Sequence, residues 1–443
     1  MNSRIISPLT IIPPALRDHP SKLFVEITTR CNLSCAMCVT QRQGSPAQEG
    51  DLDPLFFASL EPTIPHLDAL ILNGVGEPLL HPNLEEFVGR GKQLLPGNGW
   101  VGFQSNGLLM SNQRAHSLVA AGVDRICFSL DSVSPEKFRE FRQGGELEGV
   151  ERALSALAGA KKSHHRPDVG VGVEFVAMRR NLHELPAALR WAARRGASFA
   201  IVSHLLPYDE QHAGEALFGD CTAEAMELFL KWKRVGERQG VDISRYFQVR
   251  FLRYARTPEE QAIVELVEGI KRDAAQRGIL VDIKKLIRLD YHRLEEVKGV
   301  FTQAREAAAE SGLELRLPEL SLREERSCSF VEEGSAFVSW QGDISPCYFL
   351  WRRFDCYAGG WSQQVQPKLF GNLAGMTIPD IWNSREFSDF RRSVLAYDYP
   401  ACSSCTLAPC DYVQSEAFEQ DCHIRTVPCG ACLWCRGVFH CLR

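Results

Sequence analysis

The stretch at residues 23–38, LFVEITTRCNLSCAMC, decides how the rest of this sequence is interpreted. Residues 23–28 form a short apolar run typical of a buried strand, and three cysteines follow it with the spacing C-x3-C-x2-C, at Cys31, Cys35 and Cys38. Three thiolates on one loop can hold three irons of a four-iron cube and leave the fourth iron open to a small molecule. A structural zinc site needs four closed ligands, so a zinc site completed by a remote residue is the less favoured alternative.

Outward from this loop, residues up to 210 alternate between short apolar runs and amphipathic stretches. Five more strands are expected, at residues 69–72, 99–104, 125–130, 169–176 and 199–202. Helical spacing of apolar residues marks stretches between them, such as 114–121 and 185–195. Repeated alternation of strand and helix predicts βαβ units and a parallel sheet. Polar and glycine-containing segments follow most of these strands, and in a parallel barrel such segments form the catalytic rim.

The composition excludes several classes of protein. Hydrophobic residues make up 45% and charged residues 24%, which are ordinary values for a globular chain. The net charge of -5 gives no sign of a basic surface for nucleic acid. No apolar run reaches the roughly 18 residues that a bilayer-spanning helix needs, and the N-terminus lacks the pattern of a signal peptide. We therefore expect a cytoplasmic protein with neither a nucleic-acid nor a membrane partner.

The region after the predicted barrel is rich in Glu, Lys, Arg and Ala. We expect helices at residues 222–237, 258–277 and 295–311, covering the open side of the barrel. Short extended pieces are expected at residues 280–283 and 313–317. Cys127, inside a strand, and Cys221, at the start of a helix, are expected to be packing residues.

The 443 residues are about three times the length of a typical domain of roughly 100–150 residues. The expected organisation is an N-terminal arm (1–20), a core domain (21–210), an α-rich extension (211–318) and a small, irregular, cysteine-rich domain (319–443).

Eleven of the sixteen cysteines lie between positions 328 and 441. In a reducing compartment, clustered thiols indicate metal rather than disulfides. Little continuous apolar pattern is left after residue 396, and metal ligation can supply the stability that burial lacks there. From the residues alone, the C-x2-C units fit iron–sulfur clusters or a pair of zinc sites. His423 and His440 are expected to be bystanders.

Four motifs at successive strand ends resemble the radical S-adenosylmethionine (radical SAM) superfamily. The cysteine loop matches its signature, and residues 73–78 (NGVGEP) resemble the GGEP motif, whose backbone receives the amino group of the SAM methionine. Residues 105–107 (SNG) resemble its T-N-G motif, and residues 129–131 (SLD) resemble the segment that contacts the SAM ribose. The resemblance implies a partial (βα)6 barrel of the TIM type with a [4Fe–4S] cluster on the three loop cysteines.

The same resemblance implies which residues contact SAM. They are Met37, Gly74, Gly76, Glu77, Pro78, Asn106, Ser129, Asp131 and Arg142. Met37 stands where the family often has an aromatic residue, and its flexible thioether can pack against adenine. Arg142 is assigned to the SAM carboxylate because guanidinium suits carboxylate geometry.

The C-terminal cysteines resemble the SPASM extension of radical SAM enzymes, which houses two auxiliary [4Fe–4S] clusters. Cys328, Gly342 and Cys347 match the first half of the SPASM cysteine pattern. In the second half, the spacing between cysteines on either side of Cys410 differs from that pattern. Two clusters need eight thiolates, so three of the eleven are spare, with Cys356 and Cys435 the first candidates. The remaining candidate ligands are Cys328, Cys347, Cys402, Cys405, Cys410, Cys422, Cys429, Cys432 and Cys441.

The implied activity is reductive cleavage of SAM to a 5′-deoxyadenosyl radical, which abstracts hydrogen from a substrate. Such an enzyme needs an electron donor such as ferredoxin or flavodoxin, and a peptide, a protein or a cofactor precursor as substrate. No catalytic acid or base is assigned. Tyr348 stands where sulfatase maturases carry an aspartate, which argues against that activity.

Four segments, at residues 202–208, 370–373, 381–384 and 429–441, are most similar to a subgroup of maturases associated with tungsten-cofactor oxidoreductases. The alternative within the enzymes is a ribosomal-peptide-modifying radical SAM/SPASM protein. The alternative of another class is a non-catalytic iron–sulfur electron carrier or scaffold, which would not need the motifs at residues 73–78 and 129–131.

Overall fold

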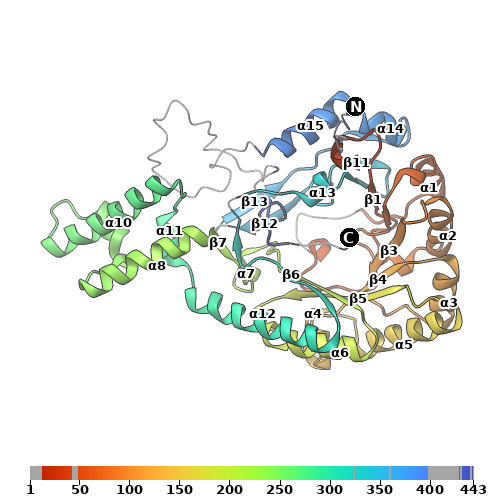
Figure 1. Ribbon diagram of the computed structural model, residues 1–443, viewed down its shortest axis with the longest axis horizontal. Coiled ribbons are helices and arrows are strands. Elements are labelled where there is room, and N and C mark those ends of the chain that lie inside the picture. Colours follow the sequence, from red (N-terminus) through yellow and green to blue (C-terminus); the bar gives the residue numbers. More distant parts are fainter. Residues whose placement is uncertain are drawn as a thin grey trace, which may run out of the picture.

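The computed structural model describes residues 12–41, 48–323, 325–358, 361–397, 429, 432–439 and 442. Six parallel strands form its centre (Figure 1): β1 (Lys22–Val25), β2 (Ala69–Ile71), β3 (Trp100–Ser105), β4 (Arg125–Ser129), β5 (Gly170–Ala177) and β6 (Phe199–His204). Every neighbouring pair among them is parallel. The six expected strands and their parallel arrangement are thereby confirmed, with ends that differ by up to three residues.

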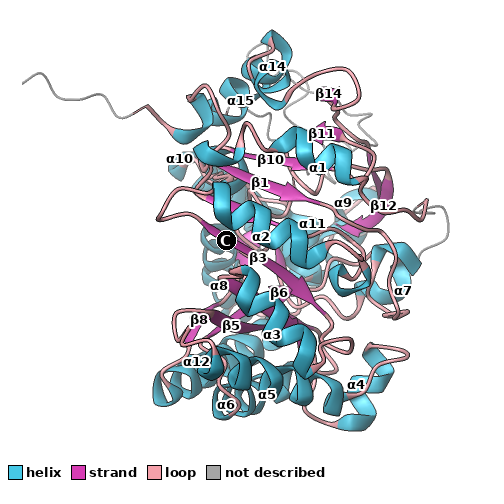
Figure 2. Cartoon of the chain, turned by 90° about the vertical axis from the view of Figure 1, so that its right-hand side faces the viewer, coloured by secondary structure: helices cyan, strands magenta, loops and turns pink. Residues whose placement is uncertain are grey.

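Helices cover the outer face of this sheet (Figure 2): α1 (Pro54–Leu60), α2 (Leu84–Leu94), α3 (Asn112–Ala121), α4 (Pro135–Phe141), α5 (Leu147–Ser163) and α6 (Leu185–Arg194). Side chains alternate between the two faces, as a strand period of two requires. Ile126 and Phe128 of β4 belong to the main apolar core, whereas Cys127 packs with Ile71 and Ile201 on the other face. Cys127 is fully buried, as expected of a packing residue.

The C-terminal segment continues the barrel sheet, which the sequence did not predict. β10 (Ser335–Val338) pairs in parallel with β1, and β11 (Asp343–Ser345) and β14 (Gly371–Asn372) follow antiparallel. At the opposite edge, β8 (Glu314–Arg316) pairs with β6, which confirms the extended piece expected there. The sheet thus has ten strands, and β10 covers the edge that β1 would otherwise expose (Figure 2).

Further short elements complete this segment: α13 (Ser329–Glu332), the antiparallel hairpin of β12 (Phe354–Ala358) and β13 (Trp361–Val365), α14 (Ile378–Trp382) and α15 (Arg385–Ala396). These elements are only four to twelve residues long, which fits the expectation of a small, irregular domain.

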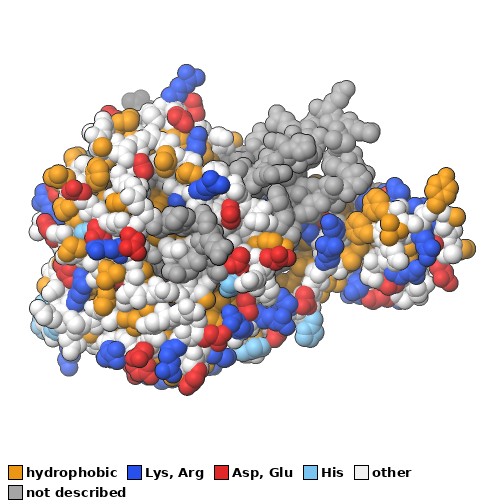
Figure 3. All heavy atoms as spheres, turned by 180° about the vertical axis from the view of Figure 1, so that it is seen from behind, with side chains coloured by type: hydrophobic (Ala, Val, Ile, Leu, Met, Phe, Trp, Pro, Cys, Tyr) orange, Lys and Arg blue, Asp and Glu red, His pale blue; other side chains and the backbone are white. Residues whose placement is uncertain are grey.

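Four helices form a lobe with an apolar core of its own: α8 (Ala223–Arg238), α9 (Tyr246–Leu252), α10 (Pro258–Arg277) and α11 (Ile283–Arg288). The lobe projects away from the barrel (Figures 1 and 3), and it does not lie across the open side as expected. α12 (Tyr291–Ser311) returns the chain and packs along α6. Within the described part of the chain, no helix is long and apolar enough to cross a membrane.

Two local expectations in this region are wrong. Residues 280–283 form no strand, because Asp282 caps α11 by accepting a hydrogen bond from the backbone N–H of Lys285, and Ile283 and Leu286 are buried one helical turn apart. Cys221 does not begin a helix, because it lies on β7 (Gly219–Thr222), which pairs with β9 (Ser321–Leu322). It is nevertheless buried in the lobe core, as expected of a packing residue.

A buried arginine joins the C-terminal helices to the start of the described chain. Arg391 of α15 donates to the carbonyl oxygen of Ala15 (2.7 Å) and to that of Trp382 (2.8 Å). Its guanidinium lies 3.6 Å from the centre of the Trp382 ring, and burial lowers its pKa to about 10. The charge persists at neutral pH because the two carbonyl groups and the aromatic face replace its hydration.

Replacing Arg391 with Met should therefore lower the free energy of unfolding by about 2–3 kcal/mol, because two buried carbonyl groups lose their donor. Urea denaturation of the anaerobically reconstituted protein would measure this. Its neighbour Arg392 is mostly exposed and serves as the control. Arg392→Met should change stability by less than about 0.5 kcal/mol. Equal losses in the two variants would contradict this role of Arg391.

Candidate functional site

The three cysteines of residues 31–38 lie on the loop that follows β1, at the carboxyl end of the sheet. The backbone fixes the loop against the end of α4. The Ser34 N–H donates to the Gln143 carbonyl (3.0 Å), and the Ala36 N–H donates to the Phe141 carbonyl (3.1 Å). Leu33 is buried beneath the loop, so one apolar side chain and two hydrogen bonds hold the thiols in place.

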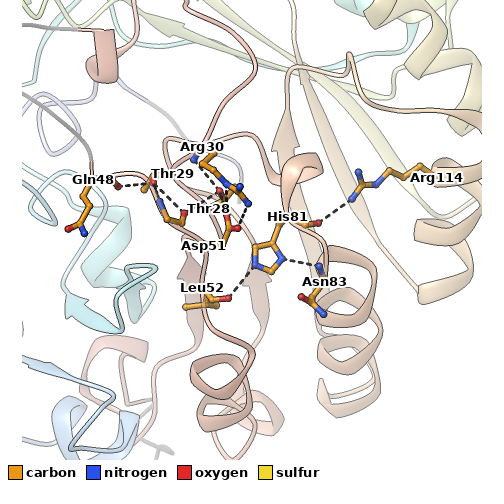
Figure 4. A network of polar contacts seen from close by, with 10 residues as sticks. Thr28, Thr29, Arg30, Gln48, Asp51, Leu52, His81, Asn83 and Arg114 are labelled. Carbon is orange, nitrogen blue, oxygen red and sulfur yellow. Dashed lines mark hydrogen bonds and ion pairs between the residues drawn. The ribbon is translucent and has the colours of Figure 1, made fainter.

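The base of this loop is tied to the strand-like segment at residues 48–52 (Figure 4). Thr28 Oγ1 donates to Asp51 Oδ1 (2.7 Å), and Arg30 Nε donates to the same oxygen (3.1 Å). Thr29 Oγ1 donates to the carbonyl of Gln48 (2.9 Å). The two threonines and the arginine that precede the first cysteine therefore anchor the loop.

A buried histidine supports the same region from below (Figure 4). His81 Nδ1 accepts from the Asn83 N–H (3.1 Å), so its Nε2 carries the proton that faces the Leu52 carbonyl (3.3 Å). Burial lowers the pKa of His81, which keeps the ring neutral in this arrangement. Arg114 Nη2 donates to the His81 carbonyl (3.3 Å), which joins α3 to the network.

The donor set of the loop fits an iron–sulfur cluster. Partial burial raises the pKa of Cys35, so ligation must displace its proton. Three thiols on one loop can each bind a separate iron of a four-iron cube.

The turn at residues 73–78 packs directly against this loop. A Cβ on Gly76 would lie 2.3 Å from the carbonyl oxygen of Thr28, and a Cβ on Gly74 would lie 2.3 Å from the side chain of Glu26. The Glu77 N–H donates to the carbonyl of Arg30 (2.8 Å). The two glycines are thus required by close approach to β1 and its loop.

Both carboxylate oxygens of Glu77 accept hydrogen bonds from other groups of the protein. Oε1 accepts from the Leu79 N–H (3.0 Å) and from Ser105 Oγ (2.7 Å), and Oε2 accepts from the Asn106 N–H (2.7 Å). The side chain is 2% exposed, and burial raises its pKa despite these bonds. Glu77 therefore joins the end of β2 to the end of β3, and Pro78 is buried beside it.

The end of strand β3 and the end of helix α4 bring two more predicted residues to the cysteine loop. Asn106 Nδ2 donates to Asn32 Oδ1 (2.8 Å) and lies 4.0 Å from the sulfur of Cys31. Arg142, the residue that ends α4, places Nη1 3.9 Å from the sulfur of Cys35. The sequence motifs thus meet around the thiols from separate strands.

Asp131 and Arg142 are paired with each other. Arg142 Nη2 lies 2.7 Å from Asp131 Oδ2, and Asp131 Oδ1 accepts from the Val176 N–H (2.9 Å). Asp131 is fully buried, and Arg142 is 9% exposed. Burial by itself lowers the pKa of Arg142, but the charge of Asp131 holds it above its ordinary value.

Met37 belongs to a small apolar cluster with Phe141, Val176, Met178 and Leu205. These residues come from the end of α4 and from the carboxyl ends of β5 and β6. Met37 thus lies against apolar side chains, and its packing against adenine stays a prediction.

A row of polar side chains crosses the sheet, and sequence reasoning missed it. Asn73 Nδ2 donates to Gln104 Oε1 (2.6 Å), and Gln104 Nε2 donates to Glu174 Oε2 (2.6 Å). Ser129, a predicted site residue, pairs with Glu174 across β4 and β5. Burial raises the pKa of Glu174 to about 7. The sequence feature that could have revealed this row is a polar residue at or near the end of each successive strand. Each of these residues lies on the face of the sheet opposite the helices.

A second group of thiols gathers in the C-terminal segment. Cys328, Cys347, Cys429 and Cys432 line one small pocket whose other lining residues are mostly apolar. Burial raises the pKa of Cys347 well above its ordinary value, and the other three thiols raise it further. An all-sulfur donor set in an apolar shell suits an iron–sulfur cluster.

Of the two candidate spares, Cys435 lies beside this group, with its sulfur 3.2 Å from the Cys432 carbonyl. Cys356 is buried on β12 and does not line the pocket. Cys402, Cys405, Cys410, Cys422 and Cys441, together with His423 and His440, lie outside the described residues.

Comparison with known proteins adds independent findings. The model of the radical SAM superfamily matches residues 25–192, and that of the SPASM iron–sulfur cluster-binding domain matches residues 328–406. A tungsten-containing aldehyde ferredoxin oxidoreductase cofactor-modifying protein of Pyrococcus furiosus is 28% identical over 428 residues, which cover 95% of this chain and 96% of that protein.

Two further matches are partial or distant. A GTP 3′,8-cyclase of Chlorobaculum tepidum is 29% identical over 188 residues, or 42% of this chain and 54% of that enzyme. This chain also aligns with the crystal structure of Streptococcus suis SuiB bound to S-adenosylmethionine. The alignment covers 84% of this chain and 68% of SuiB, with 11% identity and a TM-score of 0.48. The expectation of an enzyme that uses SAM, a [4Fe–4S] cluster and auxiliary iron–sulfur clusters is confirmed. Residues 25–192 of the chain form a radical SAM domain, and residues 328–406 belong to a SPASM iron–sulfur cluster-binding domain.

Proposed function

We propose that this chain modifies the cofactor of a tungsten-containing oxidoreductase by radical SAM chemistry. The observation that carries the proposal is the likeness to the cofactor-modifying protein, which extends over 95% of this chain and 96% of that relative. The match therefore includes the helical lobe and the SPASM domain as well as the barrel. Ferredoxin or flavodoxin in the cytoplasm is the proposed electron donor.

We assign the radical-generating cluster to Cys31, Cys35 and Cys38. When bound, this cluster and SAM together supply a 5′-deoxyadenosyl radical that removes a hydrogen atom from the substrate. The protein holds the three thiols at one place through the loop anchors described above. Arg142 lies 3.9 Å from Cys35 Sγ, so it places a positive charge beside the ligand set.

The assigned SAM contacts divide into two kinds. The backbone at Gly74 and Gly76 offers polar groups where no side chain intervenes, and Glu77 and Pro78 hold this turn in place. Around the loop, Met37 supplies an apolar surface, and Asn106, Ser129, Asp131 and Arg142 supply polar groups. Asp131 and Arg142 already form an ion pair with each other. To bind SAM, Asp131 must therefore accept hydrogen bonds from the ribose, and Arg142 must donate to the carboxylate, while the ion pair is kept.

The function can be tested by incubating the reconstituted enzyme with SAM, dithionite and the tungsten oxidoreductase of the same organism. We expect 5′-deoxyadenosine and a mass change in the extracted tungsten cofactor. Cys35→Ala should abolish both products, because two thiolates cannot hold a cube with one open iron. Cys127→Ala, which removes a buried packing thiol, is the control and should retain both. An unmodified cofactor alongside normal SAM cleavage would reject the proposed substrate.

The glycine turn gives a prediction about SAM binding. Gly76→Ala should abolish measurable SAM binding, because the new Cβ would lie 2.3 Å from the Thr28 carbonyl and displace the turn. Gly159→Ala on α5 is the control, because no atom lies within 4 Å of its new Cβ. Equilibrium dialysis with labelled SAM measures both variants. Unchanged binding by Gly76→Ala would remove the turn from the SAM site.

The SPASM thiols give a prediction about metal content. The reconstituted enzyme should hold about twelve irons, as three four-iron clusters. Cys432→Ala should lose about four irons and nearly all substrate turnover, while SAM cleavage without substrate persists in the separate barrel site. Cys356→Ala should keep its iron, because this thiol lies outside the pocket. One or two zinc ions in place of these irons would identify the C-terminal thiols as a zinc module.

A further inference from the structure

The first residue after β1 is Glu26, a buried carboxyl group that lies against the turn at residues 73–78. Its Oε1 accepts a hydrogen bond from the Val75 N–H (3.3 Å). Its Oε2 is buried and has no hydrogen-bond partner in the part of the chain that the structure describes. A buried polar atom without a partner lowers stability, and an apolar side chain would avoid that cost. Stability alone therefore does not account for a carboxyl group at this position.

The bond to Val75 fixes the direction of the Gly74 carbonyl. The Val75 N–H and the Gly74 carbonyl belong to one peptide group, and in a planar trans peptide these two groups point in opposite directions. Because the N–H points to Glu26, the carbonyl points away from it. No donor among the described residues bonds to this carbonyl, and Gly74 lines a cavity at the mouth of the barrel, where a ligand can reach it.

The turn is held on both sides of this peptide group. On one side, Glu26 packs on Gly74, since a Cβ there would lie 2.3 Å from Glu26 Cγ. On the other side, the Glu77 N–H donates to the Arg30 carbonyl (2.8 Å). The peptide group at Gly74 thus has little room to rotate, and its carbonyl is a preorganised hydrogen-bond acceptor.

Glu26 is itself fixed by the SPASM segment. Its N–H donates to the Val338 carbonyl of β10 (2.9 Å), and the Trp340 N–H faces its carboxyl group. Burial raises the pKa of Glu26 to about 8, although the N–H groups of Val75 and Trp340 lower it. The charge of Arg352 lowers this pKa as well. At neutral pH the carboxyl group is therefore mostly protonated, so glutamine is a close substitute for it.

We propose that Glu26 is a positioning residue for SAM binding, which directs the Gly74 carbonyl to the amino group of the SAM methionine. At neutral pH this amino group is an ammonium group, which can only donate hydrogen bonds, and a carbonyl oxygen can accept one. Glu26 does not contact SAM in this arrangement, because it acts through the backbone of Val75. The inference rests on the proposed SAM contacts at this turn and adds a residue outside them.

The test measures the preference for SAM over the analogue in which a hydrogen atom replaces the amino group. Calorimetry on the full-length, reconstituted enzyme should show that the wild type binds SAM about tenfold more tightly than the analogue, as expected for one hydrogen bond to a charged group. Glu26→Met keeps the chain length and removes the acceptor, so it should lose most of this preference. Glu26→Gln keeps an acceptor for the Val75 N–H and should keep the preference.

Val25→Ala is the control, because Val25 is buried in the main apolar core, on the opposite face of β1. This variant should lose stability and keep the preference for SAM. Iron content near that of the wild type shows that each variant still holds its clusters, and Glu26→Leu repeats the test if Glu26→Met holds less iron.

An undiminished preference in Glu26→Met, or a lost preference in Glu26→Gln or Val25→Ala, would overturn the inference. Equal binding of SAM and the analogue by the wild type would also overturn it, because the amino group would then have no acceptor at the turn. Failure of the proposed function looks different, because the four preferences would be as expected while the tungsten cofactor stays unmodified.

Discussion

The buried carboxylate of Glu77 is the interaction on which the geometry of this site depends. It accepts hydrogen bonds from Leu79, Ser105 and Asn106, while its own backbone N–H donates to Arg30 beside the first cysteine. A carboxylate without these partners would be costly to bury. The ends of β2 and β3 and the cysteine loop are therefore joined in one unit, so the thiols and the glycine turn keep a fixed relation.

The SPASM segment is attached to this unit by backbone hydrogen bonds of the sheet. β10 runs parallel to β1 with Lys22 opposite Ser335, so neighbouring strands carry the two groups of thiols. Cys31 follows β1, Cys328 comes just before α13 and β10, and Cys347 follows β11. A continuous sheet is stiff, because each strand is hydrogen-bonded along its length. The spacing between the barrel thiols and the SPASM thiols is thus set by the sheet and not by a flexible linker.

The cavity lined by Asn73, Gln104 and Trp434 has one polar side, from the barrel, and one aromatic side, from the SPASM segment. Barrel strands end in polar side chains on their inner face, and the amides of Asn73 and Gln104 are held by their bonds to each other and to Glu174. The SPASM segment places aromatic rings opposite them, in a packed group that includes Tyr348, Phe349 and Trp434. Polar groups on one side can orient a ligand, while the aromatic side excludes water.

The sequence by itself determined the parallel barrel, the thiol loop and the strand-end motifs, because strand period, glycine turns and cysteine spacing are local properties. It also determined α10, whose ends at Pro258 and Arg277 agree with the expected helix, since its capping box and apolar spacing are local too. Only the tertiary structure decided that β10 pairs with β1, because the four residues 335–338 do not by themselves specify which strand they pair with. Likewise, the hydrogen bond from Arg391 to the Ala15 carbonyl and the cavity lined by Asn73 and Trp434 each join segments that are remote in sequence, and packing alone brings them together.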